Sequence, residues 1–172
     1  MSKIGIVAGS FDPITNGHVW LIRKAAEMVE PDGELHVVIG VNSAKKYYFS
    51  AEKRHEQIRK VLENSLPASL FKIIHVDLID MDLLINFARK IGATYIFRGI
   101  RNTKDFEYEA EIQNINRDID DTVETIFFIP PSEFTKVSSS TVRGLVGFNG
   151  WETAVSRYVS KSVVEDFKEK LK

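Results

Sequence analysis

Short runs of apolar residues recur along the chain, and each run ends at a turn. Most of these residues are β-branched or aromatic, and they follow one another almost without interruption instead of alternating with polar residues. This pattern is typical of strands that are covered on both faces of a sheet. We therefore expect five strands, at residues 3–8, 34–41, 70–76, 94–98 and 124–130.

Between these runs the apolar residues recur at three- and four-residue intervals, which predicts helices. Ser50 and Asp105 are the expected caps at the starts of two of them, and Gly92 is the expected end of a third. The helices are expected at residues 18–30, 50–66, 81–93, 105–121 and 161–171. The fourth of these carries an apolar stripe made of Tyr108, Ile112, Ile115 and Ile119.

Strands that alternate with helices predict right-handed crossovers and a parallel sheet. The expected fold class is α/β: a Rossmann-like, doubly wound, five-stranded parallel sheet with helices on both faces. No repeat or linker interrupts the pattern, so residues 1–172 are expected to form a single domain. Ligands of such sheets bind beyond the carboxyl ends of the strands, and the segments that follow the five strands should therefore converge on one site.

The composition narrows the range of partners. Hydrophobic residues make up 44% of the chain and charged residues 27%, as in ordinary globular proteins. The net charge of -1 gives no overall field that would attract nucleic acid or a membrane surface. The chain has no cysteine and no apolar run near the roughly 20 residues that a membrane span needs, and its amino-terminal apolar run is too short for a secretory signal. We expect a soluble cytoplasmic protein.

The turn after the first expected strand has the sequence GSFDPITNGH, residues 9–18. Gly9 allows a ligand to approach the backbone, and Pro13 stiffens the turn. Gly17 and His18 stand at the expected start of a helix, where free N–H groups and the helix dipole favour an anion. A histidine there can donate a hydrogen bond to a phosphoryl oxygen without acting as a base. The plainer interpretation is a capped helix with a surface histidine.

Other strand ends also carry groups suited to phosphate. Lys45 and Lys46 follow the second strand, and Arg98 and Arg101 stand on either side of Gly99 after the fourth. Four hydroxyl residues, Ser138 to Thr141, open a helix after the fifth strand. Taken singly, lysines are usually solvated and serines usually cap helices. Their shared position at one edge of the sheet favours a phosphate site.

Several other chemistries lack their motifs. The sequence contains neither the phosphate-binding loop G-x-x-x-x-G-K-[ST] nor the dinucleotide fingerprint G-x-G-x-x-G. It also has no H-E-x-x-H and no G-x-S-x-G. His36 and His75 lie in apolar strands, where we expect them to be core or rim residues and not ligands. No metal-binding cluster is expected from the sequence.

The segment Thr15-Asn16-Gly17-His18 resembles the T/H-x-G-H motif of the nucleotidyltransferase superfamily. Within that superfamily, the segments FRGIRNTKDFEYE and VSSSTVR resemble those of the bacterial phosphopantetheine adenylyltransferases. The resemblance extends from about Lys3 to Val146. It implies Mg²⁺-dependent transfer of the adenylyl group of ATP to 4′-phosphopantetheine, which gives dephospho-coenzyme A and pyrophosphate.

The resemblance also implies roles for individual residues. His18 would stabilise the transition state, Lys45 would hold a phosphate shared by the two substrates, and Arg98 would bind the phosphate side of phosphopantetheine. Ser10 would contact both substrates, and Leu84 would line the path of the pantetheine arm. The remaining residues implied in ATP binding are Phe11, Gly99, Ile100, Arg101, Glu109, Phe134, Thr135, Lys136, Val137, Ser138, Ser139 and Ser140.

Further properties come with the family. The resemblance implies a homohexamer and inhibition by coenzyme A, and no protein ligand is assigned to the Mg²⁺. The composition already argues against a nucleic-acid or membrane partner. Two alternatives stay open at this point. The serine segment is also close to a motif of nicotinamide mononucleotide adenylyltransferases, and other nucleotidyltransferases of small phosphates share the superfamily motif. A module that binds nucleotide or coenzyme A but has lost catalysis is the alternative from another class.

Overall fold

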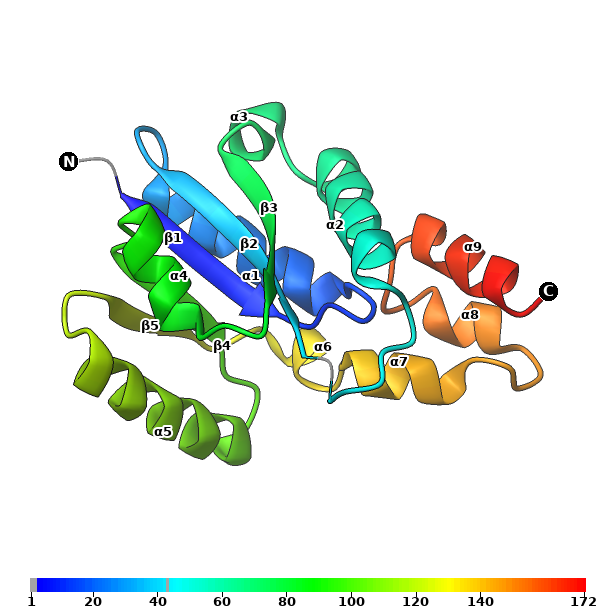
Figure 1. The fold of residues 1–172 in the computed structure, drawn as a ribbon. Helices are drawn as coiled ribbons and strands as arrows, with labels where there is room; N and C mark the ends of the chain where they lie inside the picture. The colour runs from blue at the N-terminus through cyan, green and yellow to red at the C-terminus, as the bar shows by residue number, and fades with distance from the viewer. Residues whose placement is uncertain (1–2, 43) are drawn as a thin grey trace.

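The protein forms a five-stranded, all-parallel sheet with helices on both faces, which confirms the expected fold class. The structure is a computed structural model, and it describes residues 3–42 and 44–172. The strands lie in the order β3-β2-β1-β4-β5 (Figure 1). Their bounds are β1 Ile4–Gly9, β2 Glu34–Val41, β3 Ile74–Asp80, β4 Tyr95–Gly99 and β5 Glu124–Phe128. The direction of strand order reverses between β1 and β4, so the switch point lies at their carboxyl ends.

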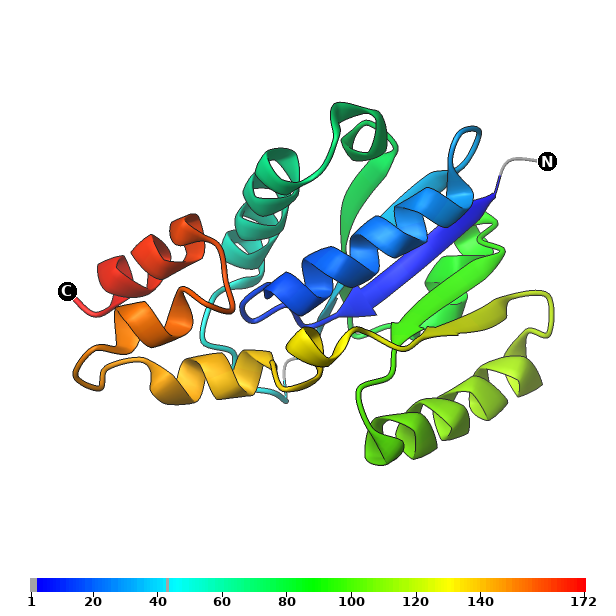
Figure 2. The same cartoon turned by 180° about the vertical axis from the view of Figure 1, so that it is seen from behind.

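Helices cover the sheet on its two faces, as Figures 1 and 2 show from opposite sides. Buried residues of α1 (Asn16–Val29) and α2 (Ala51–Ser65) join the larger hydrophobic core, and α4 (Leu84–Ile91) packs into a second core on the other face. The long helix α5 (Thr103–Ile119) runs beside β5. The remaining helices are short: α3 Ala68–Phe71, α6 Ser132–Thr135, α7 Ser139–Leu145, α8 Trp151–Val155 and α9 Lys161–Lys170.

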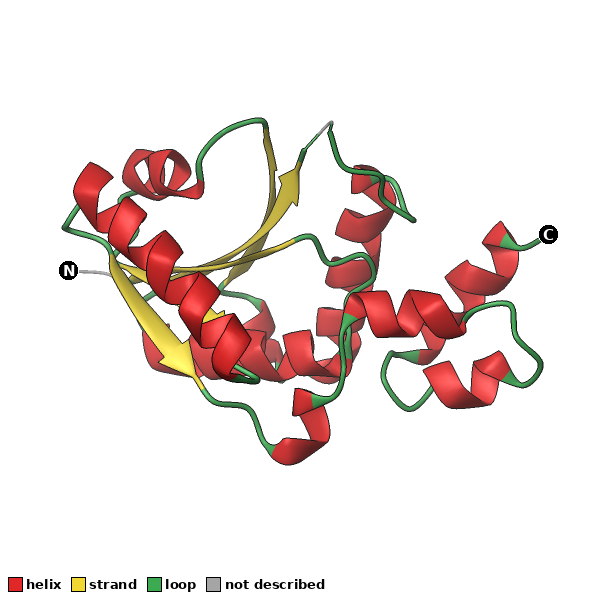
Figure 3. Ribbon diagram, turned by 90° about the horizontal axis from the view of Figure 1, so that it is seen from below, coloured by secondary structure: helices red, strands yellow, loops and turns green. Residues whose placement is uncertain are grey.

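The carboxyl-terminal helices form a cluster beyond the ends of the strands, next to α2 (Figure 3). Phe167 of α9 is fully buried against the rings of Phe49 and Trp151. On the polar side of the same contact, Lys53 of α2 forms an ion pair with Asp166 at 2.8 Å. These contacts hold α8 and α9 against α2 and the loop before it.

Several boundaries expected from the sequence are confirmed. The second strand covers residues 34–41 as expected, and the other strands except the third agree to within two residues. Ser50 caps α2, since its side chain accepts a hydrogen bond from the Lys53 N–H at 3.2 Å. Gly92 ends α4 with a φ of 68°, a left-handed conformation that glycine adopts without strain.

The prediction for the third strand is wrong. Leu70 and Phe71, expected in the strand, belong to the short helix α3, and the strand runs from Ile74 to Asp80 instead of ending at Val76. The reason is that β3 lies at an edge of the sheet. An edge strand tolerates exposed polar residues, so the second half of β3 lacks the continuous apolar pattern by which buried strands are found.

The expected cap of the long helix is also wrong. Asn102, not Asp105, caps α5, and its side chain accepts a hydrogen bond from the Asp105 N–H at 3.0 Å. The Asp105 carboxylate instead pairs with Arg101 at 2.8 Å. The apolar stripe of this helix remains largely uncovered, because no α5 residue is buried. Among the described residues, no helix is long and apolar enough to cross a membrane.

Candidate active site

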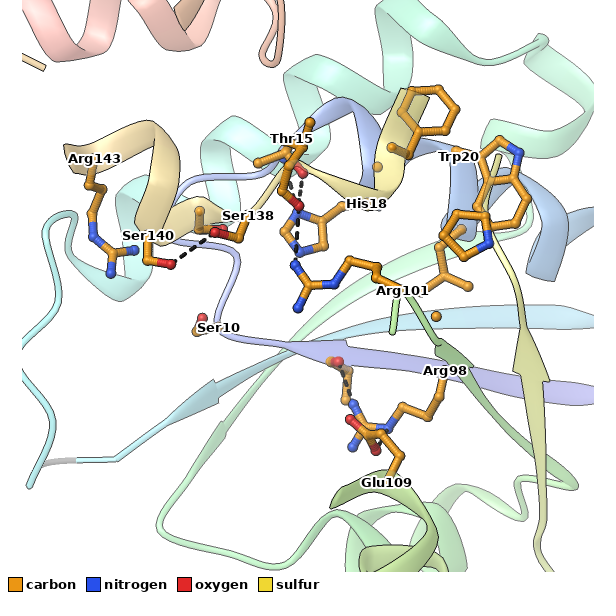
Figure 4. Close-up of a pocket in the computed structure, with 18 residues that line it drawn as sticks. Ser10, Thr15, His18, Trp20, Arg98, Arg101, Glu109, Ser138, Ser140 and Arg143 are labelled. Atoms are coloured by element: carbon orange, nitrogen blue, oxygen red, sulfur yellow. Dashed lines mark hydrogen bonds and ion pairs between the residues drawn. The ribbon is translucent and has the colours of Figure 1, made fainter. Parts of the chain in front are cut away.

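A cleft of about 380 Å³ opens at the carboxyl ends of β1 and β4, at the switch point of the sheet (Figure 4). Its walls come from the turn after β1, the start of α1, the end of β4, α5 and the segment that leads into α7. The sequence-predicted residues that line it are Ser10, His18, Arg98, Gly99, Arg101, Glu109, Phe134, Val137, Ser138, Ser139 and Ser140. The segments after β1, β4 and β5 therefore converge as expected, whereas no described residue from the segments after β2 and β3 lines this cleft.

His18 occupies the third position of α1, one turn after the residue that caps the helix. Its Nδ1 atom lies 3.0 Å from the backbone N of Thr15, which donates a hydrogen bond to it. The Thr15 hydroxyl lies at the same distance from this nitrogen. An imidazole nitrogen that accepts an N–H carries no proton of its own. The proton of the neutral ring is therefore on Nε2, and His18 presents a donor to the cleft.

Burial, together with the smaller effect of the positive charge of nearby Arg101, lowers the pKa of His18 to about 4. Figure 4 shows the Arg101 guanidinium beside the His18 ring. The imidazole consequently stays neutral at physiological pH. Since Nδ1 already accepts a hydrogen bond, the ring is suited to donate to an anion and not to abstract a proton.

The turn before His18 is held by a buried carboxylate. Asp12 is 3% exposed, and its two oxygens accept hydrogen bonds from the backbone N–H groups of Tyr48 and Phe49 at 2.7 and 2.9 Å. Phe11 adopts a φ of 46°, which is unusual for a bulky residue, and its ring packs edge-on against His18 with centroids 5.0 Å apart. Strain of this kind persists where surrounding contacts hold it, and it is common at functional sites.

A buried arginine supports the same turn from behind. The Arg54 side chain, on α2, is 1% exposed, and its Nη1 donates to the carbonyl oxygen of Ser10 at 2.6 Å. Its guanidinium also lies 4.1 Å from the centre of the Tyr47 ring. No sequence pattern indicates this role, because Arg54 lies among charged residues that resemble an exposed helix face.

The two arginines after β4 are each anchored on one side. Arg98 donates to the carbonyl oxygen of Ala8 at 2.8 Å and pairs with Glu109 at 3.1 Å. Arg101 pairs with Asp105 and donates to the carbonyl oxygen of Val137 at 3.1 Å. These contacts use part of each guanidinium and orient the rest. The cleft therefore has two fixed positive groups, and that of Arg101 lies beside the His18 ring.

The serine segment docks directly on the turn after β1. Ser139 donates to the carbonyl oxygen of Pro13 at 2.8 Å. Ser138 caps α7 by accepting from the Thr141 N–H at 3.0 Å, and its hydroxyl lies 2.9 Å from that of Ser140. Arg143 donates to the backbone carbonyl of Asp12 and faces the carboxylate of the same residue at 3.6 Å. One serine thus has the ordinary capping role, and the others tie this wall of the cleft together.

Some sequence-predicted residues lie outside the cleft. Phe11 and Ile100 are buried behind it, and the cleft lining includes neither Thr135 nor Lys136. Lys45 is exposed on the loop after β2 and is not among the described residues that line the cleft. Leu84 lines a second, smaller hollow of about 210 Å³, and Ala8 and Arg98 line both hollows.

The cleft also contains residues that the sequence reasoning missed. Trp20 forms part of the wall and lies 6.3 Å from Phe134, measured between ring centres. Thr15 and Arg143 line the cleft as well. The position of Trp20 two residues after the motif histidine was the available signal. Its half-buried side chain offers a flat apolar surface of the kind that a nucleobase contacts.

Comparison with known proteins identifies the family of the chain. A family model described as cytidylyltransferase-like matches residues 6–145, which include most of β1, the other four strands and the serine segment. The chain belongs to this family and has the fold of a nucleotidyltransferase.

Curated relatives narrow the class. The phosphopantetheine adenylyltransferase of Chromobacterium violaceum is 42% identical over 161 residues, which cover 94% of this chain and 93% of the relative. That of Lactobacillus johnsonii is 40% identical and covers 97% of this chain and 93% of the relative. The chain therefore belongs to the phosphopantetheine adenylyltransferase family.

A solved structure shares the fold at lower sequence identity. The nicotinic acid mononucleotide adenylyltransferase of Plasmodium falciparum, solved in complex with NaAD, superposes with a TM-score of 0.72. It is 20% identical, and the match covers 99% of this chain and 96% of that chain. This likeness shows the shared architecture only.

The state of His18 gives a direct prediction. In an NMR titration of the histidine side chains, we expect the His18 imidazole to protonate with a midpoint near pH 4, with Nε2 carrying the proton above that pH. The same signal should be absent from a His18→Ala variant, which assigns it.

A stability consequence follows from the same pKa. The unfolded chain protonates this histidine near pH 6.5 and the folded protein only near pH 4, so His18 lowers the stability of the fold as the pH falls through that interval. His18→Ala should lose stability less steeply there. A midpoint near 6.5 for His18 would contradict both the tautomer and the burial described above.

Proposed function

We propose that the chain transfers the adenylyl group of ATP to the phosphate of 4′-phosphopantetheine, giving dephospho-coenzyme A and pyrophosphate in coenzyme A biosynthesis. The observation that carries the proposal is the neutral His18, whose Nε2–H faces a cleft with two anchored arginines. The family relatives supply the identity of the acceptor. We also propose that residues 1–172 act as one nucleotidyltransferase domain.

The reaction needs no general base. A phosphate monoester is already ionised at neutral pH, so the attacking oxygen has no proton to lose. It attacks the α-phosphorus of ATP, a new P–O bond forms, and the bond to pyrophosphate breaks. Catalysis then depends on position and on neutralising the charge that builds on the α-phosphoryl oxygens. His18 would donate to one of these oxygens as that charge grows.

Arg98 stands where the two substrates would meet. It lines both the main cleft and the smaller hollow that contains Leu84. We propose that its guanidinium binds the phosphate of phosphopantetheine, while the pantetheine arm extends into the hollow past Leu84. ATP would occupy the main cleft, with Arg101, Glu109, the Ser10 turn and the segment Phe134–Ser140 around it.

The role of Lys45 stays a prediction. Its backbone N–H donates to the carbonyl oxygen of Asn42 at 2.9 Å, within the loop that leads from β2 to Tyr48. That loop ends at the turn after β1, because Asp12 accepts from the Tyr48 N–H. We propose that the long Lys45 side chain reaches a substrate phosphate once substrate is bound, as the family resemblance implies.

Mg²⁺ would enter with ATP. Among the described residues that line the main cleft, Glu109 provides the carboxylate, and this carboxylate already forms an ion pair with Arg98. Mg²⁺ requires several oxygen ligands and is often held by substrate phosphates and water with few protein groups. These lining residues do not form a protein cage for the ion. We propose that the phosphates of ATP carry it, and its contribution would be to neutralise phosphate charge.

We further propose that the chain assembles as a homohexamer. The support is apolar surface that the single chain leaves exposed, including Phe106, Tyr108 and Ile115 of α5 and Met81 and Leu83 before α4. A light-scattering mass of one chain at micromolar concentration would contradict this. Inhibition by coenzyme A, which the family resemblance implies, and a cytoplasmic location, which the composition suggests, stay predictions.

The function is tested by supplying the purified protein with Mg²⁺, ATP and one acceptor at a time. With 4′-phosphopantetheine we expect dephospho-coenzyme A and pyrophosphate in equal amounts. With nicotinamide mononucleotide we expect no product above the level of a His18→Ala control preparation. Turnover of nicotinamide mononucleotide alone would move the assignment to that acceptor. Tight binding of ATP without pyrophosphate release from either acceptor would indicate a binding module.

A further inference from the structure

The register between β2 and β3 brings two histidines together. His36 and His75 are paired positions of these neighbouring parallel strands. Side chains alternate along a strand, so Glu34, two residues before His36, and Asp77, two residues after His75, lie on the same face. The imidazole rings of His36 and His75 stack with their centres 4.9 Å apart. Four polar side chains thus gather near the amino ends of these strands, far along the sheet from the cleft at the carboxyl ends.

The histidine nearer the core is oriented by a carboxylate. His36 is 13% exposed by its side chain, and its Nδ1 lies 2.8 Å from Oδ2 of Asp77. An aspartate at this distance accepts the Nδ1 proton of a neutral imidazole, which leaves a lone pair on Nε2. Metal-binding histidines in proteins are commonly oriented by such a carboxylate on the other ring nitrogen. The Phe87 ring of α4 contacts His36 edge-on and covers it from the core side.

The lone pair of His36 faces other acceptors. Its Nε2 lies 3.8 Å from Oε2 of Glu34, and Nε2 of His75 lies 3.6 Å from the same oxygen. One ligand atom from each of the three residues fits within 4.8 Å of the others. These separations are too long for hydrogen bonds, which lie near 2.7–3.2 Å. A hydrogen bond from either histidine to Glu34 therefore does not explain why these three side chains lie together.

The separations fit a metal ion better. Nitrogen and oxygen ligands bind Zn²⁺ at about 2.0–2.2 Å in tetrahedral geometry, which places neighbouring ligand atoms about 3.4 Å apart. The two separations from the Glu34 oxygen, 3.6 and 3.8 Å, lie close to this value, and rotation of the side chains would bring all three ligand atoms around one ion. His75 and Glu34 are about half exposed, so both have room to move. Solvent can reach the site and supply a fourth ligand.

We propose that Glu34, His36 and His75 form a binding site for a divalent transition metal of the zinc type, with Asp77 as the residue that orients His36. Two imidazoles and one carboxylate suit Zn²⁺ better than Mg²⁺, which prefers an all-oxygen octahedron. The site lies away from the ATP cleft, and the proposal does not depend on the proposed reaction. It departs from the sequence-based expectation that these histidines are not ligands, because the strand register that pairs them was not visible in the sequence.

The test measures metal binding to the full chain after removal of metal with a chelator. Zn²⁺ is titrated by calorimetry, and Co²⁺ is titrated as a spectroscopic probe of four-coordinate geometry. We expect one ion per chain. His75→Ala should weaken binding by more than about 100-fold, because even an outer partner of a metal ligand is worth about 10–100-fold. Asp77→Asn, which removes only such a partner, should weaken it by about 10–100-fold.

His55→Ala is the matched control, since it removes a histidine from α2, outside the cluster, and should leave Zn²⁺ affinity unchanged. Zn²⁺ should also raise the melting temperature of the wild-type protein and of His55→Ala but not that of His75→Ala. Because the His75 side chain is half exposed, we expect the His75→Ala variant to fold like the wild type, and circular dichroism would check this. Equal Zn²⁺ affinity in the wild type and in His75→Ala would overturn the proposal, as would binding that is lost in His55→Ala.

Discussion

The buried carboxylate of Asp12 is the contact on which the site depends. It accepts hydrogen bonds from two backbone N–H groups of the loop before α2, and Arg143 of α7 pairs with it from the other side. Two segments that are far apart in the chain are thereby held to the turn after β1. Because His18 follows that turn by a few residues, its position relative to Arg98, Arg101 and the serine segment is set before any substrate binds.

The Thr15–His18 hydrogen bond then decides what the histidine does. A backbone N–H that donates to Nδ1 leaves the proton on Nε2, and burial keeps the ring neutral. Thr15, which caps α1, and His18, in its first turn, therefore together provide an N–H donor that faces the cleft. This fits a reaction whose nucleophile is already ionised. A histidine that served as a base would need a free lone pair facing the cleft, and His18 has none there.

The sequence predicted the parts of the molecule that depend on local pattern. The continuous apolar run of β2 and the cap at Ser50 are both local, and each agrees with the structure. The errors lie where contacts between distant residues decide the outcome. Edge strand β3 keeps polar residues because one side has no neighbouring strand, and Asp105 is drawn to Arg101, which leaves the capping position to Asn102. Arg54 looks like surface charge until α2 is placed against the Ser10 carbonyl.

The central claim is that His18 acts on the transition state and not on the binding of ATP. The most direct measurement compares wild type with His18→Ala for the affinity of ATP and the rate of the chemical step in a single turnover. We expect the rate to fall by about 10²–10³-fold, as it does when one preorganised donor to a developing oxyanion is removed, while the dissociation constant of ATP changes only slightly. An unchanged rate, or a loss that is explained entirely by weaker ATP binding, would contradict the account.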